Sequence, residues 1–144
     1  MKNKKFILIM TVMFCLFTSC SAGNIKSDKK NEDNIADSRK ADYQKITAEQ
    51  AKNMMDDGDS YILLDVRTEE EFKENRIDGA ILIPDYEINS RAEKELADKN
   101  VRILIYCRSG RRSALAAKEM IDMGYTDVYD FGGIIDWPYQ TVKN

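Results

Sequence analysis

Cys107 and the basic residues after it are the part of the chain best suited to chemistry. The thiol comes directly after an apolar run, residues 101–106, and a helix is predicted over residues 113–123. Three arginines lie in the intervening loop, whose residues are Arg108, Ser109, Gly110, Arg111 and Arg112. At a strand-to-helix turn, backbone N–H groups and the helix dipole favour a negative charge. The sequence therefore predicts that Cys107 has a lowered pKa and reacts as the thiolate.

The other two cysteines are expected to be unavailable for this chemistry. Cys15 lies in an uncharged apolar stretch, residues 6–17, that follows a lysine-rich start, and Cys20 follows two small residues. This order is typical of a bacterial lipoprotein signal, although an ordinary secretory signal with an incidental cysteine is the alternative. We expect residues 1–19 to be removed and Cys20 to be lipidated. The protein would then be exported and anchored to a bacterial cell membrane, on its periplasmic or extracellular face.

Cys107 is consequently the single thiol expected to stay free in the mature chain, which leaves no intramolecular disulfide. The chain has no histidine, so Cys–His and Ser–His catalysis and histidine metal sites are excluded. No EF-hand spacing of acidic residues occurs either, and we expect neither a metal nor a cofactor. The net charge is −3, or −6 without the three N-terminal lysines, which argues against nucleic acid as a partner.

Alternating helix and strand signals predict an α/β domain over residues 43–144. Residues 20–42 are polar and charge-mixed, and we expect a disordered tether there. Predicted strands cover residues 43–46, 61–66, 77–83, 101–106 and 127–131, and predicted helices cover residues 48–57, 69–74, 90–97 and 113–123. The glycine pair at 132–133 is expected to form a turn. This order predicts a central, mostly parallel five-stranded sheet with helices on both faces, and a site at the carboxyl ends of the strands.

Four motifs occur in an order that can be compared with a known family. They are DVRTEEEF (65–72), RIDGAI (76–81), CRSGRRS (107–113) and FGGIIDW (131–137). Together they resemble the motifs of a single rhodanese domain. The resemblance implies a rhodanese-like fold and a sulfurtransferase that carries a persulfide on Cys107. It also implies a small anionic sulfur donor, such as thiosulfate or a persulfide, and a thiol or cyanide-like acceptor.

The residues themselves support the same chemistry. Gly110 permits a loop whose N–H groups surround the sulfur, together with those of Ser109 and its neighbours. Arg108, Arg111 and Arg112 would attract the donor and stabilise the leaving sulfite. A preformed thiolate needs no general base, in agreement with the absence of histidine.

A second polar group, Asp65, Arg67 and Glu71, is expected near the site but in a structural role. We interpret Arg67 as the partner of a carboxylate that fixes a strand-to-helix turn.

Two alternative functions remain open from the sequence. A phosphatase or arsenate reductase of the same fold would need an arginine at the sixth position after the cysteine, where this chain has Ser113. The other alternative is a non-catalytic, membrane-tethered module that binds sulfur.

Overall fold

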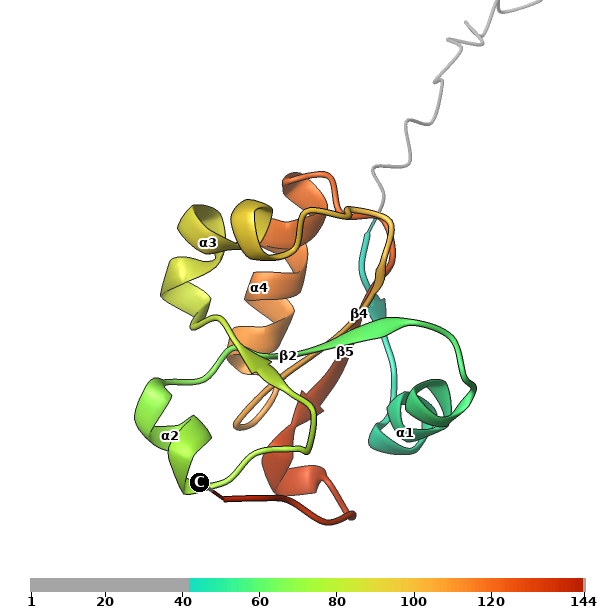
Figure 1. Ribbon diagram of the computed structural model, residues 1–144, viewed down its shortest axis with the longest axis vertical. Coiled ribbons are helices and arrows are strands. Elements are labelled where there is room, and N and C mark those ends of the chain that lie inside the picture. The colour runs from blue at the N-terminus through green and yellow to red at the C-terminus, as the bar shows by residue number, and fades with distance from the viewer. Residues whose placement is uncertain (1–41, 144) are drawn as a thin grey trace, which may run out of the picture. The chain divides into compact units, whose positions relative to one another are not determined.

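Five parallel strands form the sheet of this computed structural model, which describes residues 42–143 (Figure 1). The strands are β1 (Gln44–Lys45), β2 (Tyr61–Asp65), β3 (Ile81–Leu82), β4 (Arg102–Cys107) and β5 (Val128–Gly133). They lie in the order β1-β5-β4-β2-β3, with β4 in the centre. The predicted α/β fold is confirmed, and each strand pair of this sheet is parallel.

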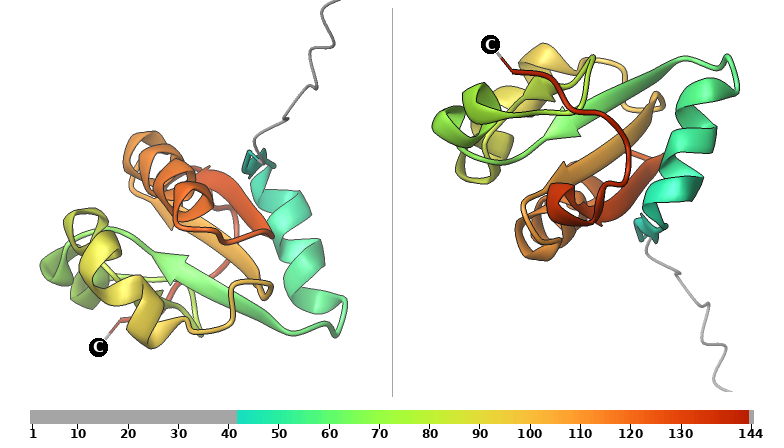
Figure 2. Two further views of the ribbon diagram at one scale, coloured as in Figure 1. Left: turned by 90° about the horizontal axis from the view of Figure 1, so that it is seen from above. Right: turned by 90° about the horizontal axis from the view of Figure 1, so that it is seen from below.

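Helices cover both faces of the sheet, as predicted (Figure 2). On one face lies α1 (Ala48–Asp56), which packs with η2 (Ile134–Asp136) over a cluster that includes Leu104 and Phe131. On the other face lie α3 (Ile88–Glu95) and α4 (Arg111–Asp122), over the larger cluster that includes Cys107. The alternation of side chains along a strand explains the division, because successive residues of β4 point to opposite faces.

Two helices begin where the capping boxes of the sequence predicted. Thr47 caps α1 and Thr68 caps α2 (Glu69–Glu74), each with the reciprocal side-chain contact three residues later. Two other helices begin earlier than predicted. α3 starts at Ile88, after the short η1 (Asp85–Glu87), and ends at Glu95. Neither η1 nor α3 has a side-chain cap, so the sequence carries no local signal for their start.

The start of α4 differs from the predicted start, and the difference affects the site. The helix begins at Arg111 rather than at residue 113, because Gly110 adopts a left-handed conformation (φ 91°) as its N-cap. Arg111 and Arg112 therefore belong to the first turn of α4 and not to the loop before it.

The glycine pair after Phe131 is also different from the prediction. Gly132 and Gly133 form the end of β5 instead of a turn, with Gly132 in a left-handed conformation (φ 91°). The register between β4 and β5 shifts here, so that Cys107 pairs with Gly133. This irregularity brings the end of β5 directly beside the end of β4.

The predicted signal peptide (1–19), the lipidated Cys20 and nearly all of the predicted tether (20–42) lie outside the described residues. Within residues 42–143, no helix has both the length and the apolar character that crossing a membrane requires.

Candidate functional site

Cys107 is the last residue of β4 and lies at the carboxyl edge of the sheet. Its side chain is only 1% exposed. The backbone N–H of Gly110 donates a hydrogen bond to Sγ, with 3.1 Å between nitrogen and sulfur. The loop thus curls back over the thiol and aims a backbone dipole at it, as expected for a group that carries negative charge.

Two opposing influences act on the pKa of Cys107. Burial raises the pKa, because it disfavours the charged thiolate. Hydrogen bonds from the backbone and hydroxyl of Ser113, and from the backbone of Ser109 and Gly110, lower it. The hydrogen bonds prevail, and the pKa of Cys107 lies below its ordinary value. The geometry therefore favours the reactive form of the sulfur.

Ser113 is a site residue whose role its sequence position does not reveal, beyond the absence of an arginine there. It is fully buried in α4, one turn from Gly110. Its hydroxyl lies 3.2 Å from the carbonyl oxygen of Gly110 and 3.3 Å from that of Gly132. Ser113 therefore contacts the loop after β4, the end of β5 and the thiol of Cys107. A serine six residues after a cysteine is a weak signal on its own, so only the fold shows this role.

Close backbone packing fixes the shape of the loop. A Cβ atom on Gly133 would lie 2.4 Å from the carbonyl oxygen of Arg108, which no side chain tolerates. A Cβ on Gly110 would lie 3.3 Å from Cα of Gly132. Gly133 therefore packs directly against the backbone of the Cys107 loop, and a substitution there would displace the loop, whereas a Cβ on Gly132 would meet nothing within 4 Å.

The three arginines predicted to bind the donor have different surroundings. Arg112 forms a two-pronged ion pair with Glu71 of α2, with both nitrogen–oxygen distances 2.9 Å. This contact raises the pKa of Arg112 and lowers that of Glu71. Arg108 and Arg111 are exposed and form no ion pair within residues 42–143. The structure thus leaves two of the three guanidinium groups available to an anion.

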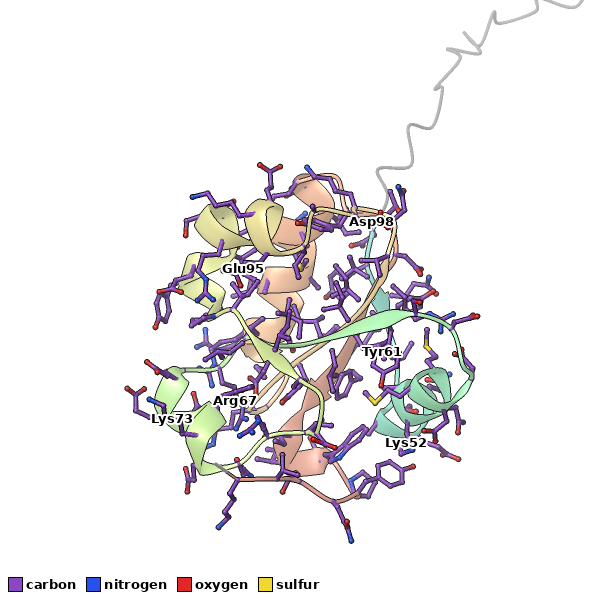
Figure 3. All side chains as sticks on the ribbon, in the orientation of Figure 1. Lys52, Tyr61, Arg67, Lys73, Glu95 and Asp98 are labelled. Atoms are coloured by element: carbon purple, nitrogen blue, oxygen red, sulfur yellow. The ribbon has the colours of Figure 1, made fainter. Side chains whose placement is uncertain are left out.

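Asp65 and Arg67 form a buried ion pair at the neighbouring strand end. The distance from Nη2 of Arg67 to Oδ2 of Asp65 is 2.6 Å, and Nη2 also donates to the carbonyl oxygen of Asn75 at 2.6 Å. This is the carboxylate pairing that the sequence predicted, and it ties the end of β2 to the end of α2. Figure 3 shows Arg67 beside α2, and Tyr61 at the opposite, amino end of β2.

Two hollows adjoin the Cys107 loop. Ser109, Gly110 and Arg111 line a pocket of ≈ 780 Å³ that extends to the start of α1. Arg108 lines another of ≈ 390 Å³ that extends to Glu71 and Asn75. Each pocket therefore has one of the two unpaired arginines on its wall. No cluster of three or more metal-ligating side chains occurs in the described part of the chain.

Comparison with known proteins agrees with this geometry. The family model described as "Rhodanese-like domain" matches residues 47–138, which include the whole sheet edge around Cys107. The chain belongs to the rhodanese family.

Two of the relatives that the chain matches are named sulfurtransferases. The chain is 38% identical over 80 residues to the thiosulfate sulfurtransferase PspE of Escherichia coli, covering 56% of this chain and 77% of that protein. It is 34% identical over 93 residues to a sulfurtransferase of Allochromatium vinosum, covering 64% and 85%. A solved E. coli structure described as a rhodanese with anions is 37% identical, with a TM-score of 0.54, covering 59% of this chain and all of that one. Several longer relatives are matched over about half of their length or less.

Proposed function

We propose that the protein is a sulfurtransferase that moves a sulfane sulfur through a persulfide on Cys107. The observation that carries the proposal is the thiol itself: a buried sulfur with a lowered pKa, facing the N–H of Gly110. The same donors that stabilise the thiolate would stabilise the terminal sulfur of a persulfide, which extends the side chain by about 2.05 Å. The named relatives support the same class of reaction.

In the first half-reaction the Cys107 thiolate attacks the outer sulfur of a small anionic donor. With thiosulfate, a new S–S bond forms to Sγ, the S–S bond of thiosulfate breaks, and sulfite leaves with the electron pair. Arg108 and Arg111 would bind the donor and stabilise the sulfite, because they are exposed and unpaired within the described residues. Arg112 is already engaged by Glu71, so we assign it a weaker share in donor binding.

In the second half-reaction a thiolate or cyanide-like acceptor attacks the outer sulfur of the persulfide. The Sγ–S bond breaks, Cys107 leaves as the thiolate, and the acceptor keeps the transferred sulfur. No proton has to move in either step when the thiolate is preformed. The hydroxyl of Ser113, where a phosphatase loop would have arginine, suits a single sulfur better than a tetrahedral oxyanion.

Incubation with thiosulfate tests the proposal directly. Intact-protein mass should rise by the mass of one sulfur, and the gain should disappear in Cys107→Ala and after addition of cyanide. A wild-type protein whose mass stays unchanged after thiosulfate, polysulfide and organic persulfide donors would overturn it. Faster turnover of an aryl phosphate than of sulfur would favour the phosphatase alternative.

We also propose that the protein is exported and held on a bacterial membrane by a lipid on Cys20. The support is the order of basic, apolar and small residues before Cys20. Cys20→Ser should move the protein from the membrane fraction to the soluble fraction. Unchanged fractionation of this variant would contradict the anchor.

A further inference from the structure

Asp130 is a buried carboxylate that the sulfur chemistry described above does not use. It lies in β5 and is 1% exposed. Asp65, the other buried carboxylate among the described residues, is paired with Arg67, whereas Asp130 has no ion pair within residues 42–143. The Oδ2 atom of Asp130 is buried and has no hydrogen-bond partner in this part of the chain. Burying a carboxylate in this way costs free energy, so the contact made by its other oxygen needs an explanation.

The other oxygen of Asp130 contacts an irregular place in the sheet. Oδ1 accepts a hydrogen bond from the backbone N–H of Gly132, with 3.0 Å between oxygen and nitrogen. Asp130 pairs with Ile105, and Gly133 pairs with Cys107, so two residues of β5 lie opposite one residue of β4. This is a β-bulge, and Gly132 adopts its left-handed conformation inside it. A bulge disrupts the regular hydrogen bonds between strands, and the carboxylate gives the Gly132 N–H an acceptor there.

The bulge also contacts the groups that surround the sulfur. The hydroxyl of Ser113 donates to the carbonyl oxygen of Gly132 at 3.3 Å. A Cβ atom on Gly110 would lie 3.3 Å from Cα of Gly132, so the bulge packs closely against the Cys107 loop. Ser113 and Gly110 both form hydrogen bonds that lower the pKa of Cys107. A displacement of Gly132 would therefore move the donors that face the sulfur.

Resting on the sulfurtransferase function proposed above, we infer that Asp130 is a positioning residue for the reactive sulfur. It acts through Gly132, which its carboxylate fixes in the bulge. The bulge in turn holds the hydroxyl of Ser113 and the N–H of Gly110 beside Sγ. This role requires an acceptor oxygen at position 130 and not a negative charge, because the donor is a neutral backbone N–H.

A direct effect of the charge on Asp130 would have the opposite sign. A nearby negative charge disfavours a thiolate and raises the pKa of the thiol. Correct placement of the hydrogen-bond donors favours the thiolate and lowers that pKa. Substitutions of Asp130 therefore distinguish the two effects by the direction in which the titration of Cys107 moves.

Variants of the full chain separate the oxygen from the charge. Asp130→Asn keeps an acceptor oxygen and removes the charge, so the thiolate of Cys107 should form with an unchanged midpoint. Asp130→Leu and Asp130→Ala remove the acceptor, so each midpoint should rise by about half a pH unit. The difference in thiolate absorbance between each variant and its Cys107→Ser counterpart measures the midpoint. This measurement needs no sulfur donor, so it is independent of the proposed reaction.

The rate of sulfur loading gives a second measurement. At neutral pH, Asp130→Leu should take up sulfur from thiosulfate about fivefold more slowly than the wild type, and Asp130→Asn should stay within about twofold. Val128→Ala is the matched control, because Val128 is buried in the same strand but lies outside the bulge. It should lower the urea concentration at which the protein unfolds, and it should change neither the titration midpoint nor the loading rate.

Three results would overturn the inference while leaving sulfur transfer intact. A changed midpoint in Asp130→Asn would show that the charge itself acts, and a fall would indicate direct repulsion of the thiolate. Unchanged midpoints in Asp130→Leu and Asp130→Ala would leave Asp130 with a structural role only. An equal rise in Val128→Ala would assign the effect to a general loosening of β5. A wild type that loads no sulfur from any donor would instead refute the proposed function, and the titrations would still test the role of Asp130.

Discussion

The turns after β2 and after β4 occupy equivalent places on neighbouring strands, yet they use arginine in opposite ways. After β2, Arg67 is buried and fully engaged by Asp65 and Asn75. After β4, Arg108 is exposed and has no ion pair within the described residues. Place in the fold and residue type are the same, so neither distinguishes a structural arginine from a binding one. The distinction lies in whether the guanidinium already has a partner.

Arg112 and Glu71 connect the two turns. Glu71 belongs to the capping box of α2, where its carboxylate accepts from the N–H of Thr68, and it also holds Arg112 of α4. The first turn of α4 is thereby fixed to the segment that follows β2. The ion pair with Glu71 therefore orders the first turn of α4 beside the Cys107 loop. It also occupies Arg112, which leaves one cation fewer to bind an anionic donor.

The largest effect on stability is expected from Arg67→Ala. The variant leaves Asp65 buried without its cation, and we expect a loss of about 3–5 kcal/mol in the free energy of unfolding. Arg108→Ala, at the equivalent place after β4, should stay within about 0.5 kcal/mol of the wild type. Urea unfolding of both variants measures the difference. Equal stability of the two would remove the contrast between the turns.

Gly133→Ala is expected to have the second-largest effect on stability. The added Cβ would lie 2.4 Å from the carbonyl oxygen of Arg108, so the Cys107 loop has to move. We expect about 1–3 kcal/mol of destabilisation and a clear fall in the rate of persulfide formation. Gly79→Ala is the control: it strains a left-handed residue (φ +77°) in open space, which costs about 1–2 kcal/mol without touching the site. Loss of sulfur transfer in both variants would show that strain, not loop position, is responsible.

Arg108→Gln and Arg111→Gln should raise KM for thiosulfate rather than lower stability. We expect each KM to rise by about tenfold at low ionic strength, with a smaller effect as salt screens the charge. Lys118→Gln removes another exposed cation of α4 and should leave KM unchanged. Steady-state kinetics with cyanide as acceptor provide the measurement, and an equal rise in the Lys118 variant would point to net charge alone.

The smallest change is expected in the titration of Cys107. Because its folded pKa is lowered, the thiolate should form with a midpoint below that of an ordinary cysteine. Ser113→Ala removes one of the lowering contacts, so its midpoint should move upward. The difference in thiolate absorbance between each protein and its Cys107→Ser counterpart reports the midpoint. A downward move in Ser113→Ala would contradict the assigned role of the serine.

The lowered pKa of Cys107 also determines how the stability of the fold changes with pH. A lowered pKa in the folded state adds stability at pH values above the unfolded pKa, and this stability is lost as pH falls through the folded pKa.

Local signals in the sequence were sufficient to predict much of the fold. The apolar run before Cys107 predicted β4 because a central parallel strand is buried on both faces. Thr47 and Thr68 predicted two helix starts because capping is a contact between residues three apart. The reactive thiol and its loop followed from the same local order, since a strand end and a helix start are adjacent in the chain.

The remainder of the site depends on contacts that no local pattern contains. Glu71 and Arg112 are 41 residues apart, so their pairing becomes visible only when α2 and α4 are placed side by side. The need for glycine at 133 arises from the backbone of Arg108, which lies in the loop after β4 and is distant in the sequence. The start of α4 was misplaced because its cap is the backbone of Gly110 and not a polar side chain.

The attachment of α2 has a consequence for local unfolding. This helix has no buried residue, and polar groups hold it: Glu71 to Arg112, Arg67 to Asn75, and the bridge from Arg76 to Val142 that follows it. By contrast, α4 buries five side chains against the sheet. Salt and acid weaken contacts of the first kind far more than those of the second. The amide hydrogens of α2 should therefore exchange with solvent long before those of α4, and the wall of the sulfur site can open without unfolding the core.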